Sequence, residues 1–76
     1  MANLTGPSKY HMTIIGAELT RRRELKGWTQ QQLAEKIRAA SGRASLSQQY
    51  INQLEAPGEH EVLIDIATAI DIVFSS

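Results

Sequence analysis

The sequence predicts a small all-α fold, and three observations support this prediction. Apolar residues recur at helical spacing along most of the chain, and two segments begin with clear N-cap signals. Alternating polar and apolar residues never form a run long enough to predict a sheet. At 76 residues the chain is one domain with a thin core. We therefore expect four to five short helices in a domain over residues 13–76.

Residues 1–12 are expected to precede this domain as an arm. Gly6-Pro7-Ser8 breaks any regular element there. His11-Met12 also resembles a cloning junction, with Met12 as the native start. The segment is therefore read as an N-terminal arm or as a remnant of cloning.

The first helix is predicted from Met12 or Thr13 to Lys26. Ile15, Leu19 and Leu25 give it an incomplete apolar stripe. Gly27 follows at the position where a glycine closes a helix.

The second helix has the clearest start. Thr29 and Gln32 fit a capping box, and Trp28 with Leu33 fits a hydrophobic staple around it. Its expected buried face consists of Leu33, Ala34 and Ile37.

The third helix repeats this pattern over Gln48 to Glu55. Ser47 is its predicted N-cap, Leu46 and Ile51 form the staple, and Ala56-Pro57-Gly58 ends it. A fourth, strongly apolar helix is expected from Glu61 to Ile70. The apolar residues at 70–74 could be misread as a strand.

The formal net charge of zero conceals a polarity along the chain. Residues 1–43 hold eight basic and three acidic side chains, a balance of +5, whereas residues 44–76 hold five acids and no Lys or Arg, a balance of −5. The basic half could contact phosphates, or the two halves could simply attract each other within the fold.

Two short capped helices in succession, the second presenting amides outward, are typical of a helix-turn-helix unit. Gln and Asn on such a helix can pair with adenine in the major groove. The segment Arg23-Glu24-Leu25-Lys26-Gly27-Trp28-Thr29-Gln30-Gln31-Gln32-Leu33-Ala34 resembles the signature of the phage repressor and Cro family of helix-turn-helix domains, which includes lambda repressor. Residues 47–55 and 63–70 are similar to that family's recognition helix and fourth helix. The resemblance covers about residues 15–72.

This resemblance implies a sequence-specific regulator that binds double-stranded DNA, most simply a repressor. It implies that Gln48, Gln49 and Asn52 reach base edges and that Arg23 and Glu55 form a structural ion pair. Gln30 would bond a phosphate at the start of its helix, where free N–H groups favour an anion. Further phosphate contacts are expected from Thr29, Ser47, Arg38, Arg43 and Tyr50.

The chain departs from the family in three places. Nine residues, 38–46, lengthen the turn between the second and third helices, which places Arg38 and Arg43 either against a phosphate or in a solvated loop. Tyr50 could touch DNA or pack over this insertion. Glu59 and Glu61, in the loop after the recognition helix, would repel phosphate unless they start the fourth helix as partners of its dipole. A fifth helix, used by relatives for dimerisation, is missing before Ser76, so the chain is a fragment or pairs through another surface.

Other classes of protein are disfavoured. The chain has no cysteine, and His11 and His60 lack metal-ligand spacing, so neither a metal nor another cofactor is expected. No nucleophile–base pair or phosphate loop predicts an enzyme. No run of residues is long and apolar enough to predict a membrane span, and a cytoplasmic, nucleoid-associated location is expected.

The expected partners are double-stranded DNA and a second copy of the chain on a palindromic site. The alternative function is a protein-interaction module, or an antitoxin that binds both operator and toxin. The acidic C-terminal half favours these alternatives, whereas the outward amides and Gln30 favour DNA.

Overall fold

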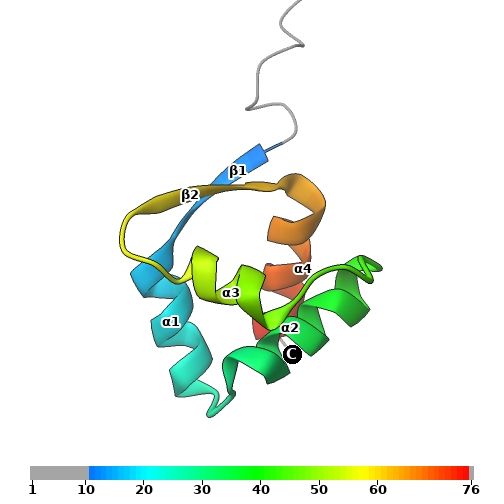
Figure 1. Ribbon diagram of the computed structural model, residues 1–76, viewed down its shortest axis with the longest axis horizontal. Coiled ribbons are helices and arrows are strands. Elements are labelled where there is room, and N and C mark those ends of the chain that lie inside the picture. Colours follow the sequence, from blue (N-terminus) through cyan, green and yellow to red (C-terminus); the bar gives the residue numbers. More distant parts are fainter. Residues whose placement is uncertain (1–10, 76) are drawn as a thin grey trace, which may run out of the picture.

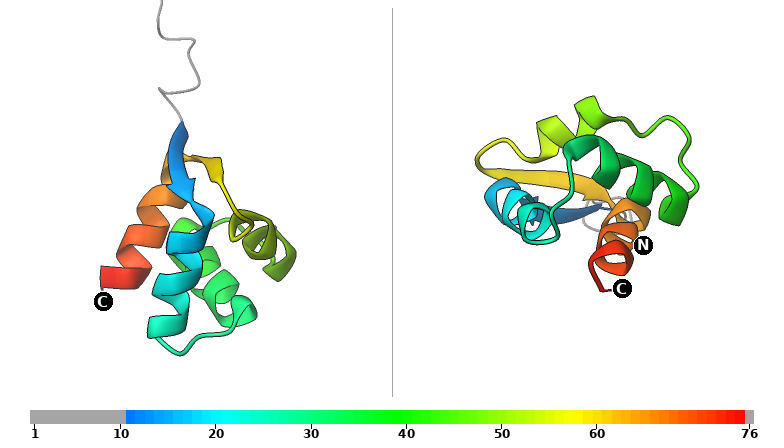
Figure 2. Two further views of the ribbon diagram at one scale, coloured as in Figure 1. Left: turned by 90° about the vertical axis from the view of Figure 1, so that its left-hand side faces the viewer. Right: turned by 90° about the horizontal axis from the view of Figure 1, so that it is seen from below.

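The computed structural model describes residues 11–75, so residues 1–10 of the predicted arm and Ser76 lie outside the described residues. Within this range the order of elements is β1 (His11–Ile15), α1 (Gly16–Leu25), α2 (Gln30–Ser41), α3 (Gln48–Leu54), β2 (Glu59–Leu63) and α4 (Ile64–Ser75). The domain is mostly helical, with a small two-stranded sheet at the end opposite the α1–α2 turn (Figures 1 and 2).

The start of α2 is as the sequence predicts. The Thr29 hydroxyl accepts a hydrogen bond from the Gln32 N–H at 3.0 Å, and the Gln32 side chain accepts one from the Thr29 N–H at 2.9 Å. Both partners of this capping box are therefore satisfied. The predicted lengthening of the turn is also present, because α2 continues to Ser41 and ends at Gly42, whose φ of 75° is left-handed.

The expected start of the first helix is wrong, because residues 11–15 are strand and α1 begins only at Gly16. The lack of a side chain at Gly16 explains this boundary. A Cβ there would lie 1.9 Å from the Ala56 carbonyl oxygen and 2.9 Å from that of Leu54. Gly16 also donates its N–H to the Gly58 carbonyl at 3.0 Å. The start of α1 is thus held against the segment that follows α3.

The expectation of an all-α fold without a sheet is also wrong. β1 and β2 pair antiparallel, with His11 opposite Leu63, Thr13 opposite Glu61 and Ile15 opposite Glu59. The predicted arm therefore contributes His11 and Met12 to the sheet. Neither strand alternates cleanly, and what stabilises each is its partner far along the chain.

The fourth helix begins later and ends later than predicted. It covers Ile64–Ser75, and the apolar residues at 70–74 continue it. Glu59 and Glu61 lie on β2 and are exposed, so they are not dipole partners of this helix. Asp65 is the acidic residue in its first turn.

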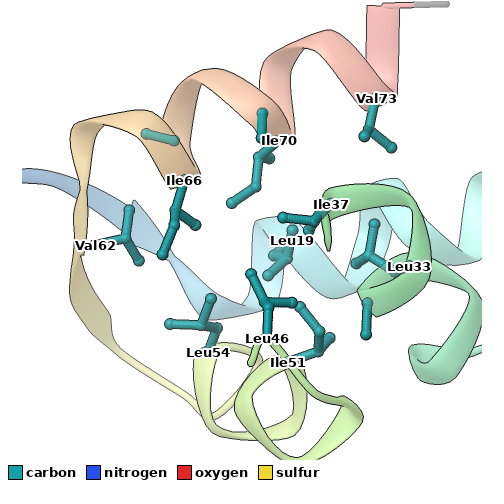
Figure 3. Packing of buried hydrophobic residues seen from close by; sticks show 13 residues of the cluster. Leu19, Leu33, Ile37, Leu46, Ile51, Leu54, Val62, Ile66, Ile70 and Val73 are labelled. Carbon is teal, nitrogen blue, oxygen red and sulfur yellow. The ribbon is translucent and has the colours of Figure 1, made fainter. Parts of the chain in front are cut away.

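All four helices and β2 contribute to one core (Figure 3). Leu33, Ile37, Ile51 and Val62 have the largest fully buried side chains. Burying side chains of this size stabilises each by about 1.5–3 kcal/mol relative to exposure. The remaining core residues are Leu19, Ala34, Leu46, Leu54, Ile66, Ala67, Ala69, Ile70 and Val73.

Candidate nucleic-acid interface

α3 presents a row of uncharged amides to solvent. The Ser47 hydroxyl caps the helix by accepting a hydrogen bond from the Tyr50 N–H at 3.3 Å. Ile51 and Leu54 point into the core, which fixes the orientation of the helix. Gln48, Gln49 and Asn52 consequently lie on its exposed side. These three residues are called the amide surface below.

A buried ion pair lies behind the amide surface. Arg23 Nε is 2.6 Å from Glu55 Oε2, and Arg23 Nη2 is 3.0 Å from Glu55 Oε1. Arg23 also donates from Nη1 to the Trp28 carbonyl at 2.8 Å. Only 14% of the Arg23 side chain and 6% of the Glu55 side chain is exposed. The structure thus joins the two residues that the family resemblance pairs, and the bidentate geometry ties α1 to the end of α3.

Gln30 connects this ion pair to the amide surface. Its Nε2 donates to Glu55 Oε1 at 2.9 Å and to Asn52 Oδ1 at 3.3 Å. Both hydrogens of the Gln30 amide group are therefore in use. Asn52 accepts from Gln30 through Oδ1, and its side chain is exposed. Arg23, Glu55, Gln30 and Asn52 form one chain of hydrogen bonds, which we call the Arg23–Asn52 network.

Charges in this network alter two pKa values. Burial raises the pKa of the Glu55 carboxyl, but hydrogen bonds from Arg23 and Gln30 and the charge of Arg23 outweigh it, so the pKa lies below its usual value. The hydrogen bond to Glu55 raises the pKa of Arg23. Both side chains are charged at neutral pH, and the network is fixed in one protonation state.

The start of α2 faces the same side as this network. Thr29 contributes the cap and Gln30 is the first helical residue. Since the Gln32 N–H is taken by Thr29, the N–H groups of Gln30 and Gln31 are the ones left to meet an anion. The phosphate contact predicted for the Gln30 side chain would require its amide to leave Asn52 or Glu55.

The predicted phosphate contacts in the insertion have partners within the protein. Arg38 Nη1 donates to the Leu46 carbonyl at 2.9 Å. Arg43 Nε donates to Asp65 Oδ2 at 2.8 Å, with 41% and 48% of the two side chains exposed. That hydrogen bond lowers the pKa of Asp65. Arg43 is therefore held by Asp65 of α4. To contact a phosphate, the Arg43 guanidinium would have to break its ion pair with Asp65.

Tyr50 packs over the insertion. It is half-buried and lines an open depression with Arg43 and Leu46. Burial raises the pKa of its hydroxyl. Tyr50 was expected either to touch DNA or to pack over the insertion, and in the structure it packs over the insertion.

The basic half and the acidic half of the chain are joined by ion pairs. Arg23–Glu55, Arg43–Asp65 and Arg22–Asp71, the last at 4.0 Å, each link one half to the other. Several basic groups also lie over aromatic rings: the Arg22 guanidinium 4.6 Å from the centre of Phe74, and Lys36 Nζ 4.7 Å from that of Trp28. The sequence polarity thus serves packing within the fold.

Sequence reasoning missed two contacts in this region. Asp65 as the partner of Arg43 and the stacking of Trp28 on Phe74, with ring centres 5.5 Å apart, both join residues far apart in the sequence. The predicted hydrophobic staple accounts for the contact of Trp28 with Leu33, but not for its contact with Phe74. No local signal could have found either contact.

Other chemistry has little support among residues 11–75. No group of three or more His, Cys, Asp or Glu side chains there could hold a metal ion. His60 lies on β2 with Nε2 2.8 Å from the Ala56 carbonyl oxygen. No helix in the described part of the chain is long and apolar enough to cross a membrane.

Comparisons with protein-family models, curated protein sequences and solved structures found no significant match to this chain. The geometry of the site is therefore what supports a function.

Proposed function

We propose that the chain is a sequence-specific DNA-binding regulator of the phage repressor and Cro type, not an enzyme, with α3 as its recognition helix. The observation that carries this proposal is the amide surface on a capped helix that is anchored in the core by Ile51 and Leu54. Gln and Asn amides both accept and donate, which lets each pair with N6 and N7 of adenine in the major groove.

The Arg23–Asn52 network supports a reading role for Asn52. Gln30 fixes the Asn52 amide with Oδ1 as acceptor and Nδ2 as donor. An adenine edge needs this combination, since its N6 donates and its N7 accepts. Asn52 enters the groove already oriented, which lowers the entropy cost of the contact.

The backbone contacts in this proposal come mostly from neutral groups. The N–H groups at the start of α2 offer an anion site next to the amide surface. Because Arg23, Arg38 and Arg43 are engaged within the protein, few counterions are released on binding. We expect a shallow dependence of affinity on salt, with a slope of log affinity against log salt of about −2 to −4.

Selection of DNA from a random pool tests the proposal, followed by binding measurements at several salt concentrations. An enriched palindrome and a negative salt slope are expected. Gln48→Ala or Gln49→Ala should then cost about 1–3 kcal/mol on the selected site and relax its sequence preference. Gln53→Ala is the matched control, because Gln53 is an exposed amide on the same helix outside the amide surface.

Gln30→Ala separates positioning from reading. If the Gln30 side chain contacts a phosphate, the variant should weaken binding to selected and unrelated sequences by similar factors. If Gln30 only positions Asn52, the variant should relax discrimination at the base pair read by Asn52 and leave binding to unrelated sequences unchanged. Circular dichroism must show that each variant is folded. If the Gln48 and Gln49 variants bind every DNA as the parent does, α3 is not the reader.

A second candidate is the protein-interaction module or antitoxin. It is favoured by the engagement of Arg38 and Arg43 within the protein and by the exposed Glu59 and Glu61 on β2. Failure to enrich any DNA sequence would make it the leading function.

A further inference from the structure

We propose that two copies of this chain pair through the free edge of β1, antiparallel across a twofold axis, to form a four-stranded sheet in the order β2-β1-β1-β2. Among residues 11–75 the sheet has two strands, so β1 has a partner strand on one edge only. The inference rests on the proposed function only in requiring a dimer on DNA, and the pairing itself can be measured without DNA.

The hydrogen-bond pattern shows which groups face the free edge. The Gly16 N–H points to Gly58 on the β2 side, and Gly16 is directly opposite Gly58 if the strand register is extended by one pair. Backbone groups alternate between the two edges of a strand. Met12 and Ile14 therefore turn their N–H and C=O groups toward β2, and Thr13 turns its own outward.

The composition of β1 leaves this edge unprotected. Edge strands that avoid pairing carry charged residues or proline, whereas β1 is His-Met-Thr-Ile-Ile and contains neither Asp, Glu, Lys, Arg nor Pro. β2 carries Glu59 and Glu61. Two β2 strands would bring these acids together, and two β1 strands bring no formal charges together. The charge pattern therefore favours pairing of β1 with β1 of the second copy over pairing of the two β2 strands.

An open groove of ≈ 260 Å³ lies beside β1, between the strand, α1 and α4. Met12 and Ile14 from β1, Leu19 from α1 and Ile70 from α4 are among its apolar lining residues. The charges on its rim are already paired, since Glu18 contacts Arg21 and Arg22 contacts Asp71. A segment seated here should therefore be uncharged, extended and apolar on one face, as β1 itself is.

The twofold axis fixes the register. With Thr13 opposite Thr13 of the second copy, Met12 of each copy lies opposite Ile14 of the other. Met12 and Ile14 lie on the same face as Val62, which is 1% exposed and points into the core. The two Met12–Ile14 pairs would cover the grooves of both copies and bury Met12, now 49% exposed. Such an interface is isologous and closes as a dimer.

Sedimentation equilibrium of the full chain without DNA tests the proposal. We expect a species of twice the 8.4 kDa chain mass. Thr13→Pro removes the outward N–H without removing a β1–β2 hydrogen bond, and it should raise the dimer dissociation constant about thirtyfold, since both N–H donors at the axis are lost. Thr13→Val keeps the N–H and should stay dimeric.

Cysteine cross-linking gives a second readout that does not depend on Thr13→Pro folding. Directly opposed, hydrogen-bonded residues have Cα atoms about 5.5 Å apart, within the range of a disulfide. The chain has no cysteine, so Thr13→Cys should form a disulfide-linked dimer on mild oxidation. The control is Ala44→Cys, exposed in the insertion.

The proposal is overturned by a parent chain that is monomeric up to about millimolar concentration, by a folded Thr13→Pro variant whose dimer dissociation constant equals that of the parent, or by Thr13→Cys linking no faster than Ala44→Cys. A dimer that binds no DNA would refute the proposed function and leave the β1 pairing intact. A monomer that selects a DNA sequence would refute the β1 pairing and leave the proposed function intact.

Discussion

Glu55 is the side chain on which the candidate interface depends most. Its two oxygens accept hydrogen bonds from Arg23 Nε, Arg23 Nη2 and Gln30 Nε2, and little of it meets solvent. A buried carboxylate with this many donors is stable only while its donors stay in place. Loss of Arg23 or of Glu55 should therefore affect the fold before it affects recognition.

A double-mutant cycle on Arg23 and Glu55 measures this dependence. Arg23→Ala or Glu55→Ala should each lower the free energy of unfolding by about 3 kcal/mol, because each leaves a buried charge unpaired. The double variant should lose about 1–3 kcal/mol less than the sum. Reversing both charges should recover part of the loss, but the Trp28 carbonyl and Gln30 would lack their present partner. Urea unfolding gives these values, and strict additivity would contradict the pairing.

The depressed pKa of Glu55 predicts a dependence of stability on pH. A carboxyl with a lower pKa in the folded state contributes stability that is fully present above its unfolded pKa, about 4.3. That stability is lost as the pH falls through the folded pKa. Urea unfolding between pH 7 and pH 3 should show the decline. The slope should be smaller in Glu55→Gln but preserved in Glu35→Gln, which alters an exposed carboxyl.

Asp65 restrains Arg43, so removing its charge should favour DNA binding. Asp65→Asn should leave stability nearly unchanged, because exposed pairs contribute little. The freed Arg43 can then meet a phosphate, which should steepen the slope of log affinity against log salt by about one unit. Glu35→Gln removes one negative charge from an exposed side chain of α2 without freeing Arg43 and is the control. Equal effects of the two variants would exclude a specific role for Arg43.

Among the helices and strands, the junction of β1 and α1 is the most constrained. Gly16 packs against the carbonyl groups of Ala56 and Leu54, which are backbone and cannot turn away. Gly16→Ala should therefore lower the free energy of unfolding by about 3 kcal/mol or more. Gly27→Ala is the matched control: its φ of 74° carries only the strain of a left-handed alanine, about 1 kcal/mol, and nothing lies near the added methyl. Similar losses would disprove the close-contact explanation.

The same elements show what the sequence could and could not predict. The starts of α2 and α3 were predictable, because Thr29 with Gln32 and Ser47 with Tyr50 act within one turn of helix. β1 and β2 were missed, because each strand is specified by a partner more than forty residues away. Ile14 and Ile15 fit a helical stripe as well as a strand, and the contact of Gly16 with Ala56 that decides between them is tertiary.

In the candidate site, too, the features set by local sequence were predictable and those set by tertiary packing were not. The amide surface was predictable, since the cap at Ser47 and the buried Ile51 and Leu54 orient α3. The Arg23–Glu55 pair came from the family resemblance. The engagement of Gln30 with Asn52 and of Arg43 with Asp65 depends on how the helices pack, which local sequence does not encode.

Ion pairs link the basic first half of the chain to its acidic second half, around the core that all four helices and β2 share. Arg22, Arg23 and Arg43 from the first half each meet a carboxylate of the second. Because these three arginines are engaged within the protein, they do not form an open basic surface. A protein built in this way should discriminate between DNA sequences more than it attracts DNA in general.

The pairing of β1 with β2 also sets an order of events during translation. β1 is synthesised 48 residues before the end of β2, a delay of about 2–10 s at ordinary rates of elongation. During that time α1, α2 and α3 can emerge and begin to pack, while β1, which contains no Asp, Glu, Lys or Arg, has not yet paired with β2. On stalled ribosomes, β1 should therefore be cleaved by protease until residue 63 has left the exit tunnel, and be protected afterwards.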